Sequence, residues 1–435
     1  MRGRALAVAL ALVACGALCT AGGARADPRF GDSSWVAPGA PSEDPTIAGA
    51  RVAAPDHARG WETALRTPFR VAFFPLRLTT RGLEAIADRY GDRLHDRKPP
   101  RPGISLGPEF DLGGLSDIGV GPGVTWVGFP VADSKLTLGG TWSTVDRRRA
   151  RFSDVIHDHG AVALRLGAVY DYKPNRRYFG TGNDAPKTDL SYFLLESTTA
   201  RAALLLGASP LRQLRLVGGY SGMSPRRGYR GSPLLENVFT AGVPYEHEAT
   251  QELLVGLSGD VASLDDARNP SLGVHGRIEL THAAGLREHD PDYNQWLFEG
   301  RAYVPVFAKR RVIALRGVYS GIDPTGGAAT LPYYRLVSSD GALRFAGYPT
   351  DRFRDRQLAL AHVEYRWTIV HQVSALVLYE LGAVAPRTSA LALATAHRSY
   401  GAGLRLGMSD GAAARLEVGK STEGLEVNLQ FGSDF

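Results

Sequence analysis

The C-terminal end of the chain is a run in which apolar and polar side chains alternate strictly. Apolar residues take every second position at Leu425, Val427, Leu429 and Phe431, and the final residue is also aromatic, Phe435. Because successive side chains of a β-strand point to opposite faces, the run predicts a strand with one apolar and one hydrated face. Such a terminal strand is typical of outer-membrane β-barrels, in which the outer-membrane assembly machinery reads it as an assembly signal. The run therefore predicts architecture and location together.

The N-terminal end has the pattern of an export signal. Arg2 and Arg4 supply positive charge, residues 5–18 form a short apolar stretch, and Ala24-Arg25-Ala26 fits a cleavage site. Residues 1–26 are therefore predicted to be the signal peptide of a protein exported to the outer membrane of a Gram-negative bacterium.

Both cysteines of the chain, Cys15 and Cys19, lie within this signal. Cleavage after Ala26 leaves a mature chain with no thiol, no disulfide and no cysteine metal site. Residues 12–15 also have the order of a lipoprotein cleavage box, with Cys15 as the lipidated residue, and this alternative stays open.

The composition fits an exported β-protein. No stretch after the signal approaches the ~18–20 continuous apolar residues that a membrane-spanning helix requires. A barrel hides its membrane character in this way because only alternate residues face lipid. The three arginines of the signal leave with it, so the net charge falls from +6 to +3. Basic residues are spread among nearly as many acidic ones, which argues against nucleic-acid binding.

Residues 27–103 are predicted to form an N-terminal linker that carries one amphipathic helix. Residues 27–60 are rich in Pro, Gly, Ala and Asp, a composition that favours little fixed structure. Apolar side chains recur at helical spacing from Leu83 to Leu94, and the prolines after Arg97 end that helix. Two placements stay open for this helix: under the barrel mouth in the periplasm, or as a plug inside the lumen.

Residues 104–435 are predicted to form the barrel itself. Alternating runs recur at 162–171, 274–281, 296–304 and 400–408, and several of their polar faces carry charge, which suits a hydrated lumen. At roughly 20 residues per strand and turn this length gives about 16 strands, and ~9–11 residues suffice for a membrane strand. Because backbone groups in lipid must be paired, the sheet should close on itself. The predicted fold is therefore all-β: a transmembrane antiparallel β-barrel preceded by a short periplasmic or plug helix.

A series of short motifs in a fixed order gives the chain a family resemblance. The motifs are Arg177–Asp184, with the order aromatic-Gly-x-Gly-Asn; Asp266–Pro270, followed by Gly273; Gly347-Tyr348, Arg352–Asp355 and Glu364–Arg366; Leu378–Gly382; and Tyr400–Arg405 before the terminal strand. In this order they resemble the bacterial surface antigen family. That family is the barrel half of the outer-membrane assembly and translocation superfamily, which includes BamA- and TamA-like proteins. The resemblance implies a long loop that folds into the barrel.

The chain departs from the family pattern in two places. The family's loop signature has Arg directly before Gly, but here Ala346 precedes Gly347 and the nearest earlier arginine is Arg344. Either a longer reach from Arg344 substitutes for the missing side chain, or its role is lost. Periplasmic POTRA domains normally precede such barrels, and the residues before the first expected strand do not have that pattern. The chain therefore resembles a POTRA-less member.

Charged residues that are predicted to face the lumen could hold this loop inside the barrel. Glu364 and Arg366 occupy the charged, inward positions of an alternating run, and the family pattern places Glu380 and Gly382 inward as well. The loop carries Arg344, Gly347, Tyr348, Arg352, Arg354 and Asp355. We expect its arginines to pair with Glu364 and Glu380 and so to set the conformation of the barrel. The alternative is that these residues are ordinary solvated lumen charges.

Signals for chemistry are weak. His157-Asp158-His159 lacks a third spaced metal ligand, and no Lys-Ser/Thr pair follows the glycines at 119–123 to make a phosphate loop. No enzyme activity, metal or cofactor is therefore expected.

Two classes of function follow. The resemblance implies a barrel that aids protein insertion or translocation across the outer membrane, surrounded by outer-membrane lipids and acting with a separate periplasmic partner. The alternative is a passive pore or structural surface antigen that keeps the fold without assembly activity. The sequence leaves open whether the lumen is open or plugged.

Overall fold

The computed structural model describes most of the chain after Arg101. The described residues are 102–112, 117–132, 134–157, 162–209, 212–266, 269–306, 308–325, 330–370, 373–407 and 413–431. The predicted signal peptide and amphipathic helix lie outside these residues, and so does Phe435. Within the described residues, no helix combines the length and the apolar character that crossing a bilayer requires.

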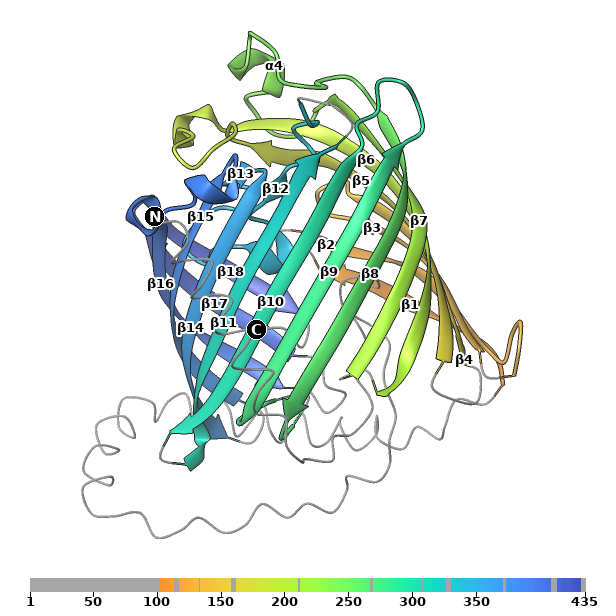
Figure 1. The fold of residues 1–435 in the computed structure, drawn as a ribbon. Coiled ribbons are helices and arrows are strands. Elements are labelled where there is room, and N and C mark those ends of the chain that lie inside the picture. Colours follow the sequence, from red (N-terminus) through yellow and green to blue (C-terminus); the bar gives the residue numbers. More distant parts are fainter. Residues whose placement is uncertain are drawn as a thin grey trace, which may run out of the picture.

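Sixteen antiparallel strands form one sheet, in which each strand is hydrogen-bonded to the next one along the chain (Figure 1). This number confirms the predicted count of about 16. The order skips once, because β11 pairs directly with β14 while β12 (Val337–Ser338) and β13 (Arg354–Asp355) form a separate small hairpin. The other strands are β1 (Gly103–Leu112), β2 (Ile118–Val127), β3 (Ser134–Ser143), β4 (Arg148–His157), β5 (Val162–Tyr178), β6 (Ser191–Ser209), β7 (Arg212–Arg227), β8 (Thr250–Leu264), β9 (Gly273–Gly285), β10 (Tyr293–Val306), β11 (Ala308–Pro324), β14 (Gln357–Val370), β15 (Val373–Ala385), β16 (His397–Gly407), β17 (Ala413–Ser421) and β18 (Gly424–Phe431).

The sheet curves into the wall of a barrel (Figure 1). Along its strands, exposed apolar side chains alternate with buried polar ones. In β14, Val363 is 43% exposed, whereas the next residue, Glu364, is fully buried. In β18, Leu425 and Val427 are exposed and Asn428 is buried. The alternation predicted for both strands therefore places its apolar positions on the outer surface.

The connections between strands differ at the two ends of the barrel. At one end neighbouring strands follow each other closely along the chain: β14 ends at Val370 and β15 begins at Val373. At the other end longer loops gather, as Figure 1 shows around α4. These loops contain α4 (Leu235–Val238), η2 (Lys187–Asp189), η3 (Gly341–Leu343), η4 (Thr388–Ala390) and η5 (Leu393–Thr395). Outer-membrane barrels have short periplasmic turns and longer extracellular loops, so we name these the short-turn end and the long-loop end.

The largest hydrophobic core lies inside the barrel. The loop between β11 and β14, described from residue 330 to 356 and called here the inward loop, inserts Phe345 and Phe353 among apolar side chains of the inner wall. Wall residues in this core include Val318 of β11 and Leu358 of β14. The loop is therefore folded into the lumen, as the family resemblance implied.

Candidate functional site

The tip of the inward loop, Phe345–Tyr348, is anchored by aromatic packing. Phe345, Tyr348 and Phe353 are each at most 1% exposed. Their rings meet edge to face, with centroids between 5.0 and 6.1 Å apart. Burial of such large side chains stabilises the docked tip, and the edge-to-face geometry adds to it.

The backbone of Ala346 is held by the barrel wall through both of its polar groups. Its N–H donates to Glu380 Oε2 of β15 at 2.6 Å. Its carbonyl oxygen accepts from Asn428 Nδ2 of β18 at 2.8 Å. Position 346 is where the family signature carries arginine. In this chain the attachment to Glu380 uses the main chain, so it needs no arginine side chain.

Three glycines let the tip approach the wall. A Cβ on Gly419 of β17 would lie 2.2 Å from the carbonyl oxygen of Ala346, and a Cβ on Gly382 of β15 would lie 2.2 Å from the ring of Phe345. On the loop itself, a Cβ on Gly347 would lie 2.8 Å from the backbone of Lys420. Gly347 and Gly382 were predicted from the motifs, and both have a steric role.

Glu380 joins three strands to the loop. Besides Ala346, its carboxylate accepts hydrogen bonds from His362 Nδ1 of β14 at 2.9 Å and from Ser399 Oγ of β16 at 2.6 Å. The side chain is buried, and each carboxylate oxygen has a donor. A buried carboxylate is stable only when its lone pairs are matched in this way. Removing it would leave several donors without an acceptor.

The predicted ion pairs between the loop arginines and Glu364 or Glu380 are wrong. The acidic partners in the structure are Glu417 for Arg344 at 4.0 Å, Glu423 for Arg352 at 2.7 Å, and Asp351 for Arg354 at 2.8 Å. The reason is that Glu364 is already paired with two arginines of the wall. Glu380 accepts from two wall side chains and from the loop backbone at Ala346. The Arg344 guanidinium therefore lies beside Glu417 of β17 and makes no ion pair with Glu380.

Glu364 belongs to a chain of charges along the inner wall. It meets Arg366 of the same strand at 2.8 Å and Arg415 of β17 at 2.7 Å. Arg415 also pairs with Glu417, which is the residue nearest to Arg344 of the loop. The predicted inward residues Glu364 and Arg366 thus stabilise the wall on which the loop rests.

Asp351 connects the inward loop to the opposite side of the barrel. Its carboxylate contacts Arg176 of β5 and Arg354 of the loop, and it accepts a hydrogen bond from Ser338 at 2.6 Å. Burial alone would raise the pKa of Asp351. The two guanidinium groups lower it by more than burial raises it, so the pKa lies well below its usual range. Asp351 is therefore charged whenever the loop is docked at neutral pH.

Asp355, the last predicted acid of the loop, has no such cationic neighbourhood. It is buried in the small β12–β13 hairpin and accepts the backbone N–H of Arg356 at 2.8 Å. Burial raises the pKa of Asp355 above its usual value. Asp351 and Asp355 therefore respond to acid in opposite directions.

The motif at Arg177–Asp184 lies in the β5–β6 loop, which crosses to the C-terminal strands. Asn183 Nδ2 donates to the carbonyl oxygen of Thr395 at 2.7 Å, and Asn183 Oδ1 accepts from the N–H of Val384 at 3.1 Å. Next to it, Gly182 N–H donates to the carbonyl oxygen of Arg354 in the inward loop at 2.8 Å. The β5–β6 loop and the inward loop are therefore tied together at the long-loop end.

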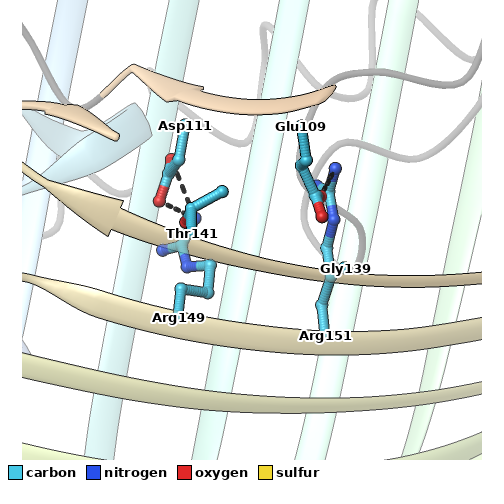
Figure 2. Close-up of a pocket in the computed structure, with 6 residues that line it drawn as sticks. All are labelled: Glu109, Asp111, Gly139, Thr141, Arg149 and Arg151. Carbon is cyan, nitrogen blue, oxygen red and sulfur yellow. Dashed lines mark hydrogen bonds and ion pairs between the residues drawn. The ribbon is translucent and has the colours of Figure 1, made fainter. Parts of the chain in front are cut away.

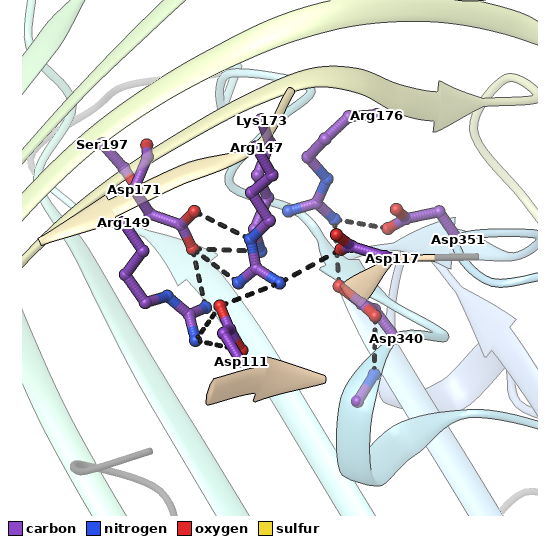
Figure 3. A network of polar contacts seen from close by, with 11 residues as sticks. Asp111, Asp117, Arg147, Arg149, Asp171, Lys173, Arg176, Ser197, Asp340 and Asp351 are labelled. Carbon is purple, nitrogen blue, oxygen red and sulfur yellow. Dashed lines mark hydrogen bonds and ion pairs between the residues drawn. The ribbon is translucent and has the colours of Figure 1, made fainter. Parts of the chain in front are cut away.

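A separate set of ion pairs connects β1 to β4 and β5 (Figure 3). Arg149 of β4 meets Asp111 of β1 at 3.0 Å and Asp171 of β5 at 2.9 Å. Arg147, in the turn before β4, contacts the same two aspartates. Figure 3 also shows Arg176, which extends from β5 to Asp351. Polar contacts therefore run from β1 through β5 to the inward loop.

Closer to the middle of β1, a second ion pair spans two strands (Figure 2). Glu109 pairs with Arg151 of β4, although β2 and β3 lie between them in the sheet. Figure 2 shows the carboxylate passing beside Gly139 of β3. A Cβ on Gly139 would overlap with the Glu109 side chain. The glycine therefore provides the path for this contact.

Four of the five predicted assembly-signal residues lie in β18. Leu425 and Val427 are on its outer face, and Leu429 and Phe431 complete the same run. Phe435 lies outside the described residues. The polar face of this strand was not singled out by the sequence analysis, although its Asn428 is the residue that reaches the loop.

Several contact residues have no signal that a single sequence could reveal. Ser399, Arg415 and Glu417 are single polar side chains in otherwise ordinary strands, and their partners are distant in sequence. Among the described residues, no group of three or more His, Cys, Asp or Glu side chains is placed to hold a metal ion. The contacts of these residues therefore support a role in holding the inward loop inside the barrel.

These features define an outer-membrane type of β-barrel with a docked inward loop. No family model matches the chain, and no curated protein matches it. Solved structures do match in fold. BamA from Haemophilus ducreyi lacking POTRA domains 1-3 is similar with a TM-score of 0.57 and 16% identity, over 76% of this chain and 70% of that one. CdiB from Escherichia coli is similar with a TM-score of 0.50 and 12% identity, over 78% of this chain and 64% of that one.

At these identities the likeness shows the fold alone. The chain spans just under two thirds of the CdiB chain. The resemblance inferred from the motifs is thus confirmed at the level of the barrel: the chain has the BamA-like barrel architecture.

Proposed function

We propose that the protein is a barrel of the outer membrane of a Gram-negative bacterium that aids the insertion or translocation of other proteins. One observation carries the proposal: the loop tip is docked on β15 and β18 through Ala346, at the position of the family's loop signature. The BamA-like fold supports the same class. No catalytic step is part of the proposal, and a separate periplasmic partner would supply client binding.

In this proposal the inward loop sets the conformation of the C-terminal strands. Glu380 is placed to transmit that constraint because it contacts the loop, β14 and β16 at once. A client that displaced the tip would remove one donor from the acceptor that β14 and β16 share.

The test is depletion of the protein followed by quantification of the outer-membrane proteome. Loss of a defined set of outer-membrane proteins, restored by wild type and by Glu380→Gln but not by Glu380→Ala, is the expected result. Gln keeps a carbonyl acceptor for Ala346 and Ser399, whereas Ala removes it. A periplasmic partner would be identified by cross-linking from the short-turn end.

The alternative is a passive pore or structural surface antigen. The substitution of the signature arginine by Ala346 is the feature that favours it. Its expected signs are an unchanged outer-membrane proteome on depletion and stable ion conductance from the purified protein alone. That pair of results would overturn the proposed insertion or translocation role.

A further inference from the structure

A cluster of aromatic and basic side chains lies on the outer face of the barrel at the long-loop end of β3–β7. We call it the rim cluster. Its centre is Arg148 of β4, whose side chain is 52% exposed beside Trp142 of β3, which is 62% exposed. The full set is Trp142, Arg148, Tyr172, Arg177, Arg226, Tyr229 and Arg230.

The strand register shows that the rim cluster faces outward. Arg148 is directly opposite Trp142 on β3 and Tyr172 on β5, so the three side chains share one face of the sheet. On β5, Tyr172 alternates in step with Val162 and Leu164, which are exposed apolar residues of the outer surface. Asp171 and Arg149 lie on the opposite face of these strands, because their side chains point into the lumen and pair there.

The height of the rim cluster matches the edge of the membrane. From Val162 to Tyr172 the outward positions of β5 run from an apolar residue near the short-turn end to the cluster itself. Ten residues at ~3.4 Å each, tilted by roughly 40°, rise about 25 Å, which is the height of the apolar band of an outer-membrane barrel. Tyr172 and Arg148 therefore lie at the level of the lipid headgroups.

The guanidinium of Arg148 is held in a fixed position. It lies 5.0 Å from the ring centroid of Trp142 and 5.1 Å from that of Tyr172. Its Nε and Nη2 contact Asp146 in the adjoining turn, and Tyr229 donates its hydroxyl hydrogen to the same carboxylate. The Arg148 side chain is nevertheless 52% exposed. Stacked arginine side chains of this kind lose little entropy when they bind a phosphate.

Further cations surround this centre. Arg226 of β7 pairs with Glu196 but is 62% exposed at its side chain. Arg177 is opposite Tyr192 on the outer face, and Arg230 follows Tyr229 in a segment that packs over the same strands. Among the residues that the structure describes, no carboxylate contacts Arg177 or Arg230. The rim cluster therefore carries more positive than negative charge.

We propose that the rim cluster binds the phosphorylated sugar headgroup of a glycolipid in the outer leaflet, the chemistry of lipopolysaccharide. Guanidinium groups fit phosphate oxygens, and flat aromatic rings fit the apolar faces of sugar rings. A phospholipid headgroup would use the arginines but not Trp142 and Tyr229. This inference rests on the proposed outer-membrane location, and it is independent of any insertion or translocation activity.

The test measures binding of purified lipopolysaccharide to the full-length mature protein in detergent. The variant is Arg148→Ala/Arg230→Ala, and a second variant, Trp142→Ala, removes a ring without changing charge. Both are expected to bind at least ten-fold more weakly than wild type. The matched control is Arg398→Ala/Lys420→Ala, because these exposed cations flank the exposed Tyr400 on the outer face of β16 and β17. The control should bind like wild type.

Folding is checked in every variant by heat-modifiable mobility on gels. If a variant fails to fold, Arg148→Lys is used in its place, because lysine keeps the charge but loses the stacking on the aromatic rings. Equal binding by the rim and control variants would overturn the proposal. So would equal competition by phosphatidylglycerol micelles, which supply phosphate without the sugar. Cell fractionation tests the location separately: a protein absent from the outer membrane contradicts the proposed function, whatever the binding result.

Discussion

The two sides of the barrel are held by different kinds of contact. On the C-terminal side, β14–β18, the inward loop is attached through the backbone of Ala346 and through buried rings such as Tyr348. On the N-terminal side, β1–β5, ion pairs between side chains join the strands, such as Asp111 with Arg149. An ion pair between Arg176 and Asp351 also joins β5 to the inward loop. Backbone contacts require close approach, whereas long side chains reach across a distance and depend on charge.

Glycine serves both sides but in different ways. Gly419 permits two backbones to meet, while Gly139 permits the side chain of Glu109 to pass over a strand. The C-terminal side should therefore be sensitive to added volume and to the loss of one acceptor. The N-terminal side should be sensitive to charge and salt. Desolvation offsets much of the attraction in a partly buried ion pair, so screening by salt removes a large share of the net stabilisation that remains.

The largest effect is expected from Glu380→Ala. The substitution removes the acceptor of three donors, so the backbone N–H of Ala346, the hydroxyl of Ser399 and the ring Nδ1–H of His362 lose a buried partner. We expect a loss of about 3 kcal/mol in the free energy of unfolding. The measurement is the urea midpoint of the detergent-folded barrel.

The control is Glu380→Gln, which keeps one carbonyl oxygen for Ala346 and Ser399. Its amide can donate to His362 if the imidazole changes tautomer. A loss of about 1 kcal/mol or less is expected for this variant. Equal losses for Ala and Gln would mean that the charge of Glu380, and not its acceptor geometry, holds the loop.

Added volume at the loop contact should have the next largest effect. In Gly419→Ala the new Cβ would lie 2.2 Å from the carbonyl oxygen of Ala346, so the loop or β17 must move. Overpacking of this kind costs about 1–3 kcal/mol. Limited proteolysis of the inward loop and the urea midpoint report it. Gly218→Ala, where a Cβ meets no atom within 4 Å, is the matched control and should behave like wild type.

A cycle with the loop identifies the source of that cost. When residues 344–349 are replaced by a Gly/Ser linker, Gly419→Ala should have almost no further effect, because the atom that it meets is gone. A cost that persists without the tip would place the strain in the sheet, and the steric account of Gly419 would then fail.

The fold was predictable from the sequence because its signal is local and repeated. Runs of alternating apolar and polar residues, such as the run that contains Leu425, Val427 and Phe431, specify strands. The number of strands follows from the length of the chain. The loop partners were not predictable to the same degree. Ala346 acts through its backbone, which has no residue-specific signal, and Asn428 is one polar residue among many in its strand. The arginine pairing failed because Glu364 is paired with Arg366 and Arg415, and Glu380 accepts from wall side chains and from the loop backbone.

A smaller effect is expected on the N-terminal side. Glu109→Ala and Arg151→Ala each break an ion pair whose side chains are 7% and 15% exposed. Each single variant should lose about 1–2 kcal/mol, and the double variant should lose less than the sum, because the second change removes a charge already left alone. Urea midpoints at low and high salt report it. Additive losses would show that the two residues act independently and that this ion pair does not hold β1 to β4.

The smallest effect is expected from mild acid, because Asp351 and Asp355 oppose each other. Burial raises the pKa of Asp351, but Arg176 and Arg354 lower it below its usual range. Its contribution to docking is therefore complete above the ordinary value of about 3.9 and is lost as the pH falls through the lower folded-state pKa. Burial raises the pKa of Asp355, so protonation of that residue favours docking as the pH falls toward about 3.9.

Hydrogen exchange of loop peptides, corrected for intrinsic rates, separates the two signs. Wild-type protection should stay level or rise slightly from pH 6 to pH 4 and then fall. Asp355→Asn should remove the rise, because the amide carries no charge to bury, while it keeps an oxygen for the N–H of Arg356. Asp351→Asn should remove the acid-induced fall. A fall in wild-type protection that begins near pH 6 contradicts the assignment. It would mean that a group other than Asp351 links the loop to β5, and that the loop depends on charge as the N-terminal strands do.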